Sequence, residues 1–181
     1  HSEELPTGVR NARLRQHLSS VDYRIVIRKS SRPDVTLVAN STHALSLSTA
    51  KELSAGIYIR VCDQNRSNAD LTASHKVQAL QLKDQHSNNM TDELSDDLLR
   101  RVVNVETFHT PYFASHDEYF LPFCSDFRKT IEEGKNTGSL ELDNNQLVIH
   151  TGSLSGPKTI FLTNYTYARL RCKGGRLSIV E

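Results

Sequence analysis

Alternation of apolar and polar residues is the feature that most constrains the fold of this chain. In YRIVIRK, residues 23–29, aromatic and aliphatic side chains alternate with positions that include two arginines, which is typical of a half-buried strand. Similar segments recur along the chain, and short helices are predicted between groups of them. The predicted strands are 35–39, 57–63, 76–83, a hairpin turning at 143–145, and two C-terminal strands joined at Gly174–Gly175.

The predicted helices are few and short. HALSLSTAKELSAG, residues 43–56, has a rough apolar face and a glycine placed to end a helix. A second helix follows the linker near residue 90, with Asp92 or Ser95 as its cap and leucines facing the core, and a third ends at Gly134. Strands that outnumber helices exclude a parallel βαβ fold and favour a barrel or a sandwich with helical plugs.

The order strand, short helix, glycine, long strand, loop, strand is typical of the second half of an OB-fold barrel. We therefore expect a mostly β chain with short helices, an OB-fold-like β-barrel with α+β elaborations. Residues 1–90 are predicted to form the OB-fold-like domain. Residues 91–181 are predicted to be a helical insertion plus a β-rich C-terminal part, which either extends the same barrel or forms a second OB-like module.

Composition excludes several kinds of function. The 181 residues carry a formal net charge of +1, so any contact with nucleic acid must come from a local basic patch. The three cysteines are far apart and form no metal-binding motif, and the sequence has neither a nucleophile elbow nor a phosphate-binding loop. We expect no metal, no cofactor and no enzymatic activity. No apolar run is long enough to cross a bilayer, so no membrane partner is expected.

Four N-x-S/T triplets begin at Asn40, Asn65, Asn89 and Asn164. Such triplets accept N-linked glycans in secreted proteins, so a secreted, glycosylated β domain is one alternative. Against secretion, the N-terminal residues HSEELPTGVR lack the apolar core of a signal peptide, and an odd number of cysteines favours a reducing compartment.

One part of the chain resembles a known family. VTLVANSTHALSLSTAKELSAGIYIRVCDQNRS, followed by HKVQALQLKDQH, is similar to the second OB domain of the Protection of Telomeres proteins, within residues 22–86. The resemblance implies a nuclear protein at chromosome ends that binds telomeric, G-containing single-stranded DNA, with other telomere proteins as further partners. By position it implies base contacts from Asn40, Asn65 and Lys83. Ala39 departs from the family, because a stacking aromatic is expected there.

The residues themselves favour the same activity. Tyr58 and Arg60 share one strand face, and Arg66 follows in the next loop, so a ring and cations are available to an unpaired strand. Aromatic stacking contributes about 1–3 kcal/mol per base, and basic side chains follow the phosphates. The predicted nucleic-acid-binding set is Tyr23, Arg24, Arg28, Asn40, Tyr58, Arg60, Asn65, Arg66 and Lys83.

Other interpretations of these residues stay open. A basic strand can instead protect a sheet edge from aggregation, and the aromatic residues between 108 and 123 can pack a small core beneath a loop. The alternative function is a protein-interaction module with a β-barrel or sandwich fold and no nucleic-acid binding.

Overall fold

The computed structural model describes residues 22–33, 35–47, 52–63, 77–109, 118–173 and 176–180. It confirms a mostly β chain with a few short helices. The strands are β1 (Asp22–Ser31), β2 (Thr36–Leu37), β3 (Thr42–Ser46), β4 (Leu53–Asp63), β5 (Val77–Lys83), β6 (Leu94–Ser95), β7 (Glu118–Pro122), β8 (Leu140–Glu141), β9 (Gln146–Thr151), β10 (Lys158–Lys173) and β11 (Arg176–Val180). The helical segments are α2 (Asp96–Leu98), η1 (Leu99–Val103), α3 (Asn104–Phe108) and α4 (Phe127–Glu133).

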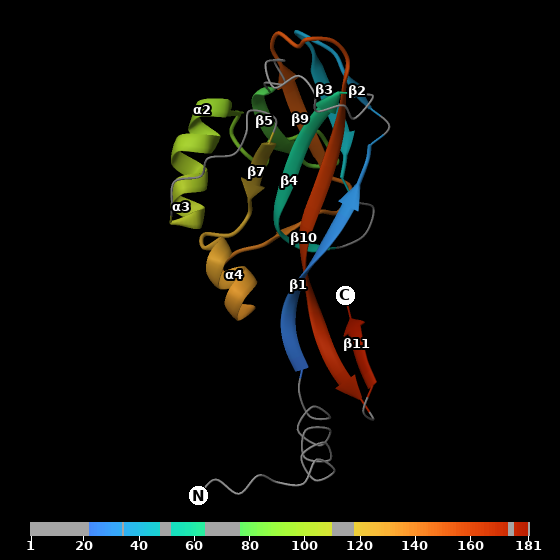
Figure 1. Ribbon diagram of the computed structural model, residues 1–181, viewed down its shortest axis with the longest axis vertical. Helices are drawn as coiled ribbons and strands as arrows, with labels where there is room; N and C mark the ends of the chain where they lie inside the picture. The colour runs from blue at the N-terminus through green and yellow to red at the C-terminus, as the bar shows by residue number, and fades with distance from the viewer. Residues whose placement is uncertain are drawn as a thin grey trace, which may run out of the picture.

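The strands form two antiparallel sheets (Figure 1). The first has the order β1-β10-β4-β7, with β2 and β11 also paired to β10 and β8 paired to β4, and the second has the order β3-β9-β5-β6. The predicted boundary near residue 90 falls in the loop between β5 and β6, and both sheets combine strands from before and after it.

The strand pairings are nested, and this nesting defines the topology. Among the eight strands of the two sheet orders, β1 pairs with β10, β3 with β9, β4 with β7, and β5 with β6. The first strand therefore pairs with the last and each inner strand with its counterpart, as if one long hairpin were wrapped around a core. This is the arrangement of an eight-stranded jelly roll, in which two sheets face each other and remain open at their edges.

The period of two in the sequence explains the core. On β4, Ile57, Ile59 and Val61 are at most 1% exposed, while the alternating Tyr58 and Arg60 are half-buried on the opposite face. The facing sheet contributes buried leucines and isoleucines from β3, β5 and β9 to the same cluster. At roughly 25 cal/mol per Å² of apolar surface removed from water, this shared core is the main force that holds the two sheets together.

Two local predictions are wrong. The helix predicted over residues 43–56 is absent: Thr42–Ser46 form β3 and β4 begins at Leu53, while residues 48–51 lie outside the described part. Leu45 is 1% exposed because it packs between the sheets, so burial overrides a weak helical pattern. The segment 140–151 is not a hairpin, because β8 pairs with β4 and β9 pairs with β3 and β5.

The two later helical predictions are confirmed. The Ser95 side chain accepts a hydrogen bond from the Leu98 amide at the start of α2, and Asp126 accepts one from the Lys129 amide at the start of α4. Gly134 ends α4 with a φ of 64°, and its α-hydrogen faces the Arg24 carbonyl, where a Cβ would lie 2.4 Å from the oxygen. Leu99 is buried as expected, whereas Leu98 is 40% exposed, contrary to the prediction.

α3 and α4 pack on the outer face of the first sheet. Phe108 of α3 and Phe127 of α4 meet Phe120 of β7, with ring centroids 5.1 and 4.7 Å from that ring, and Tyr165 of β10 completes the cluster. Edge-to-face contacts of this kind add to the burial of apolar area. The prediction that aromatic residues of this region pack a small core is confirmed for Phe108 and Phe120, while residues 110–117 lie outside the described part.

Candidate interaction surface

The outer face of the first sheet gathers most of the described residues from the predicted binding set. Tyr58 and Arg60 lie opposite Thr163 and Phe161 of β10, so all four side chains share that face. On the other side of β10, Arg28 lies opposite Tyr165, and the Arg28 guanidinium carbon is 5.5 Å from the Tyr165 ring centroid.

The basic residues of β1 do not form a row of equivalent cations. Arg28 covers Tyr165, and Arg32, which directly follows β1, lies 5.5 Å from the ring centroid of Phe161, so both guanidinium groups rest on aromatic faces. Arg24 is exposed near the start of β1. Lys29 has the opposite orientation and takes part in an ion pair described below. The surface is therefore a flat mixture of rings, guanidinium groups and hydroxyls, partly covered by α3 and α4.

The structure does not bring the other predicted residues to this face. Lys83 is half-buried at the end of β5, in the other sheet. Asn40 lies in the turn before β3 with a φ of 51°, and its amide donates a hydrogen bond to the Gly152 carbonyl. The side chain of Tyr23 and all of Asn65 and Arg66 lie outside the described residues.

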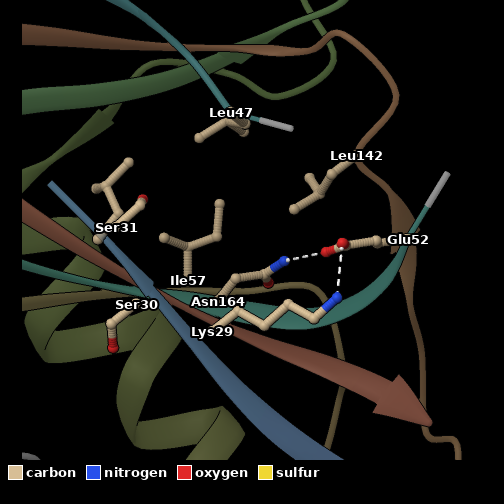
Figure 2. Close-up of a pocket in the computed structure, with 9 residues that line it drawn as sticks. Lys29, Ser30, Ser31, Leu47, Glu52, Ile57, Leu142 and Asn164 are labelled. Carbon is tan, nitrogen blue, oxygen red and sulfur yellow. Dashed lines mark hydrogen bonds and ion pairs between the residues drawn. The ribbon is translucent and has the colours of Figure 1, made fainter. Parts of the chain in front are cut away.

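A small pocket lies at one end of the sandwich (Figure 2). Its volume is about 150 Å³, and its apolar wall is formed by Leu47, Ile57, Leu142 and Leu162. Figure 2 shows Lys29, Glu52 and Asn164 gathered at its polar side. Ile57, Leu142 and Leu162 are at most 5% exposed and belong to the core, so the pocket is a shallow depression that borders the core.

Glu52 joins three strands at this end of the sandwich. Its Oε1 lies 2.8 Å from Lys29 Nζ of β1, and its Oε2 accepts hydrogen bonds of 3.4 Å from Asn164 Nδ2 and Thr166 Oγ1 of β10. Ser54 donates a hydrogen bond to Asn164 Oδ1. Both carboxylate oxygens are thus used within the protein. The arrangement holds β1, β10 and the start of β4 together.

Glu52→Gln is expected to lower the free energy of unfolding by about 1 kcal/mol, because the ion pair to Lys29 is lost while the amide still reaches Asn164. The Lys29 side chain is 32% exposed and that of Glu52 is 14% exposed, so solvent screening keeps the effect modest. Urea unfolding at neutral pH measures the change. Glu141→Gln, an exposed position on β8, is the matched control. Equal stabilities of the two variants would contradict the role given to Glu52.

Comparison with known proteins agrees with the topology. No protein-family model matches the chain, and no curated protein matches it. Among solved structures, a chain of the PBCV-1 virus capsid aligns with 94% of this chain at a TM-score of 0.66 and 8% identity. The Faustovirus major capsid protein aligns with 93% at a TM-score of 0.66 and 10% identity. The chain shares its fold with viral capsid proteins.

The matches cover only part of each capsid protein's own length. A structure of Sulfolobus turreted icosahedral virus aligns with 82% of the chain at a TM-score of 0.51 and 13% identity. This chain spans 54% of the PBCV-1 chain, 36% of the Faustovirus protein and 39% of the Sulfolobus virus chain. The chain therefore corresponds to about half or less of each of these proteins.

These findings overturn the resemblance to the Protection of Telomeres family. The nested two-sheet topology replaces the closed OB barrel, and the structural neighbours are capsid proteins. The predictions that followed from the resemblance are therefore wrong: binding of telomeric single-stranded DNA, partnership with telomere proteins, and a nuclear location at chromosome ends. The alternative, an interaction module with a sandwich fold and no nucleic-acid binding, fits better.

The sequence contained one signal that could have pointed to the jelly roll. The first clear strand, from Tyr23, and the long strand before Gly174 are both basic and alternating, and they pair along ten residues from Asp22–Arg171 to Ser31–Leu162. Pairing of the first strand with the last long strand is the outermost pair of the nested arrangement. Local pattern alone gives no such long-range partner and favours the pairing of segments that are adjacent in the sequence.

None of the described helices is long and apolar enough to cross a membrane.

Proposed function

We propose that this chain is a structural jelly-roll unit of a capsid-like assembly, and that its role is to bind other subunits rather than to catalyse a reaction. The observation that carries the proposal is the alignment of more than nine-tenths of the chain with the PBCV-1 capsid chain and the Faustovirus major capsid protein, across both sheets.

The packing of the protein supports this role. Both sheets bury a continuous apolar cluster, and the polar links at Glu52 and at the buried Lys158 tie neighbouring strands together. A subunit that carries load in a shell needs such a rigid body with flat outer faces. The matched proteins are about twice this length or longer, so an equivalent unit here requires a second body, supplied by another subunit or by further chain.

The test is direct observation of assembly. The purified chain is examined by light scattering and negative-stain electron microscopy over a range of salt concentrations. We expect discrete symmetric oligomers, sheets or shells, strengthened by salt because flat faces with aromatic side chains dominate over net charge. Disruption of the core by Ile59→Asp provides the unfolded control. A chain that stays folded without forming any assembly larger than a dimer would overturn the proposal.

A further inference from the structure

Three strand segments extend beyond the two-sheet body. Figure 1 shows the first part of β1, the last part of β10 and β11 continuing away from the sandwich. We call residues 22–25, 168–173 and 176–180 the arm. In it, β10 pairs with β1 on one side and with β11 on the other. Within the described residues β11 pairs with no other strand, so it is an edge strand.

The two faces of the arm differ in chemistry. Directly opposed residues share a face, so Leu177 and Ile179 of β11 lie on the same face as Cys172 and Leu170 of β10. The opposite face carries basic side chains, namely Arg24, Arg169 and Arg171.

β11 exposes more apolar surface than an isolated edge strand normally does. Leu177 is 59% exposed, Ile179 is 54% exposed and Val180 is 38% exposed, in a strand of five residues. Proteins usually protect such an edge with a charge, a proline or a bulge, because the free N–H and C=O groups template pairing with another chain. β11 carries one charge, at its first residue Arg176, and has none of these devices between Leu177 and Val180. The exposed apolar side chains and the unpaired edge of β11 therefore favour pairing with another strand.

The sequence of β11 is complementary to itself in one antiparallel register. A two-fold axis through Ser178 places Leu177 of one chain opposite Ile179 of the other, twice, and Arg176 opposite Val180. No charged residues of the same sign meet. A shift by one residue would continue the apolar face of one copy into the basic face of the next, so the alternation favours the Ser178 register.

We infer that the arm is a homodimerisation element, in which β11 of one copy pairs antiparallel with β11 of a second copy about Ser178. The two three-stranded ribbons then form one six-stranded ribbon with a continuous apolar face. A second copy fits better than an unrelated strand. In a two-fold symmetric contact the same residues of both copies meet, and the unpaired backbone N–H and C=O groups of both β11 edges form hydrogen bonds with each other. The inference rests on the proposed function, since it names one of the contacts through which such a subunit assembles.

Cross-linking tests the register. Directly opposed Cα atoms in antiparallel strands lie about 4.5–5.5 Å apart, within the range that a disulfide spans. Ser178→Cys is therefore expected to form a covalent dimer under mild oxidation, visible on a non-reducing gel. The native cysteines are buried, and burial raises the pKa of the Cys124 thiol, which slows its reaction. Ser46→Cys, an exposed serine on the edge strand β3, is the matched control and should stay monomeric.

Charge substitution tests the apolar face. Leu177→Lys with Ile179→Lys is expected to raise the dimer dissociation constant about tenfold or more in sedimentation equilibrium, since four cations would face one another across the axis. Leu98→Lys with Val102→Lys makes the same change at two exposed apolar positions on α2 and η1, and should leave the constant within about twofold. Circular dichroism of both variants checks that they remain folded.

The outcomes separate this inference from the proposed function. Loss of the dimer in the β11 variant alone, together with the Ser178→Cys cross-link, supports the arm. Equal association of the wild type and the β11 variant, equal cross-linking at Ser46 and Ser178, or a monomeric wild type overturns it. Large assemblies that persist unchanged in the β11 variant would overturn the arm while leaving the capsid-like role standing. A dimer through β11 with no larger assembly would support the arm and overturn the capsid-like role.

Discussion

Phe120→Ala is expected to lower the free energy of unfolding by about 3–5 kcal/mol, the largest effect of any alanine substitution considered for this protein. Phe120 is 2% exposed and lies at the centre of the cluster formed with Phe108, Phe127 and Tyr165. Its removal leaves a cavity beneath α3 and α4 and separates them from the sheet. Chemical denaturation gives the change, and loss of the near-ultraviolet circular dichroism of the cluster should accompany it.

The control uses the same substitution on the open part of the sheet. Phe161 is half-buried beside Arg32, so Phe161→Ala should cost clearly less, about 1–2 kcal/mol. Gly56 provides a second check, because a Cβ there would lie 2.5 Å from Phe120 Cζ. Gly56→Ala should therefore be destabilising alone and cost less in the Phe120→Ala background. Equal costs for Phe120→Ala and Phe161→Ala would contradict the anchoring role of the cluster.

Asp63→Asn is expected to cost about 2–4 kcal/mol, because it leaves the ammonium group of Lys158 buried without its carboxylate. Lys158 and Asp63 lie directly opposite each other on β10 and β4, and the Lys158 side chain is only 1% exposed. Lys158 Nζ also donates a hydrogen bond of 2.8 Å to the Ser155 hydroxyl, which carries no charge to offset that of the ammonium group. Asp63 itself is 29% exposed, which screens the pair and keeps the expected cost below that of a fully buried one.

A double-mutant cycle decides how much of this cost comes from the stranded cation. Lys158→Met removes the charge but keeps the long stem, so Asp63→Asn combined with Lys158→Met should be more stable than Asp63→Asn alone. Urea unfolding of the four proteins at neutral pH gives the coupling energy. Arg128→Met with Glu132→Gln, an exposed ion pair on α4, is the matched control and should show a coupling below about 0.5 kcal/mol. Similar coupling in both cycles would show that burial of Lys158 is without consequence.

The evidence for the fold and the evidence for the function differ in kind. Topology and alignment over almost the whole chain establish the jelly roll, although sequence identity to its neighbours is 8–13%. A fold can remain recognisable at that level because the core requires only apolar residues of suitable size at alternating positions. The role in an assembly depends on surface residues, and the interface experiments on β11 address those directly.

Local chemistry in the sequence determined much of the secondary structure. Alternation located β1, β4, β5 and the β10–β11 hairpin, Ser95 and Gly134 marked helix ends, and composition indicated a mostly β chain. The prediction that Tyr58 and Arg60 share one face of a strand is confirmed, because a period of two fixes which side chains share a face. These features depend on residues close together in the chain.

Only the tertiary structure decided which strands pair and therefore which fold the chain adopts. The residues from Asp22 to Ser31 pair with residues more than 130 positions away, and Leu45 became part of a strand because its partners on β9 bury it. The same alternating segments can bury their apolar faces and expose their polar faces equally well in a barrel or in a sandwich. The choice depends on the packing of distant apolar faces against each other, a property of the whole chain that local pattern does not contain.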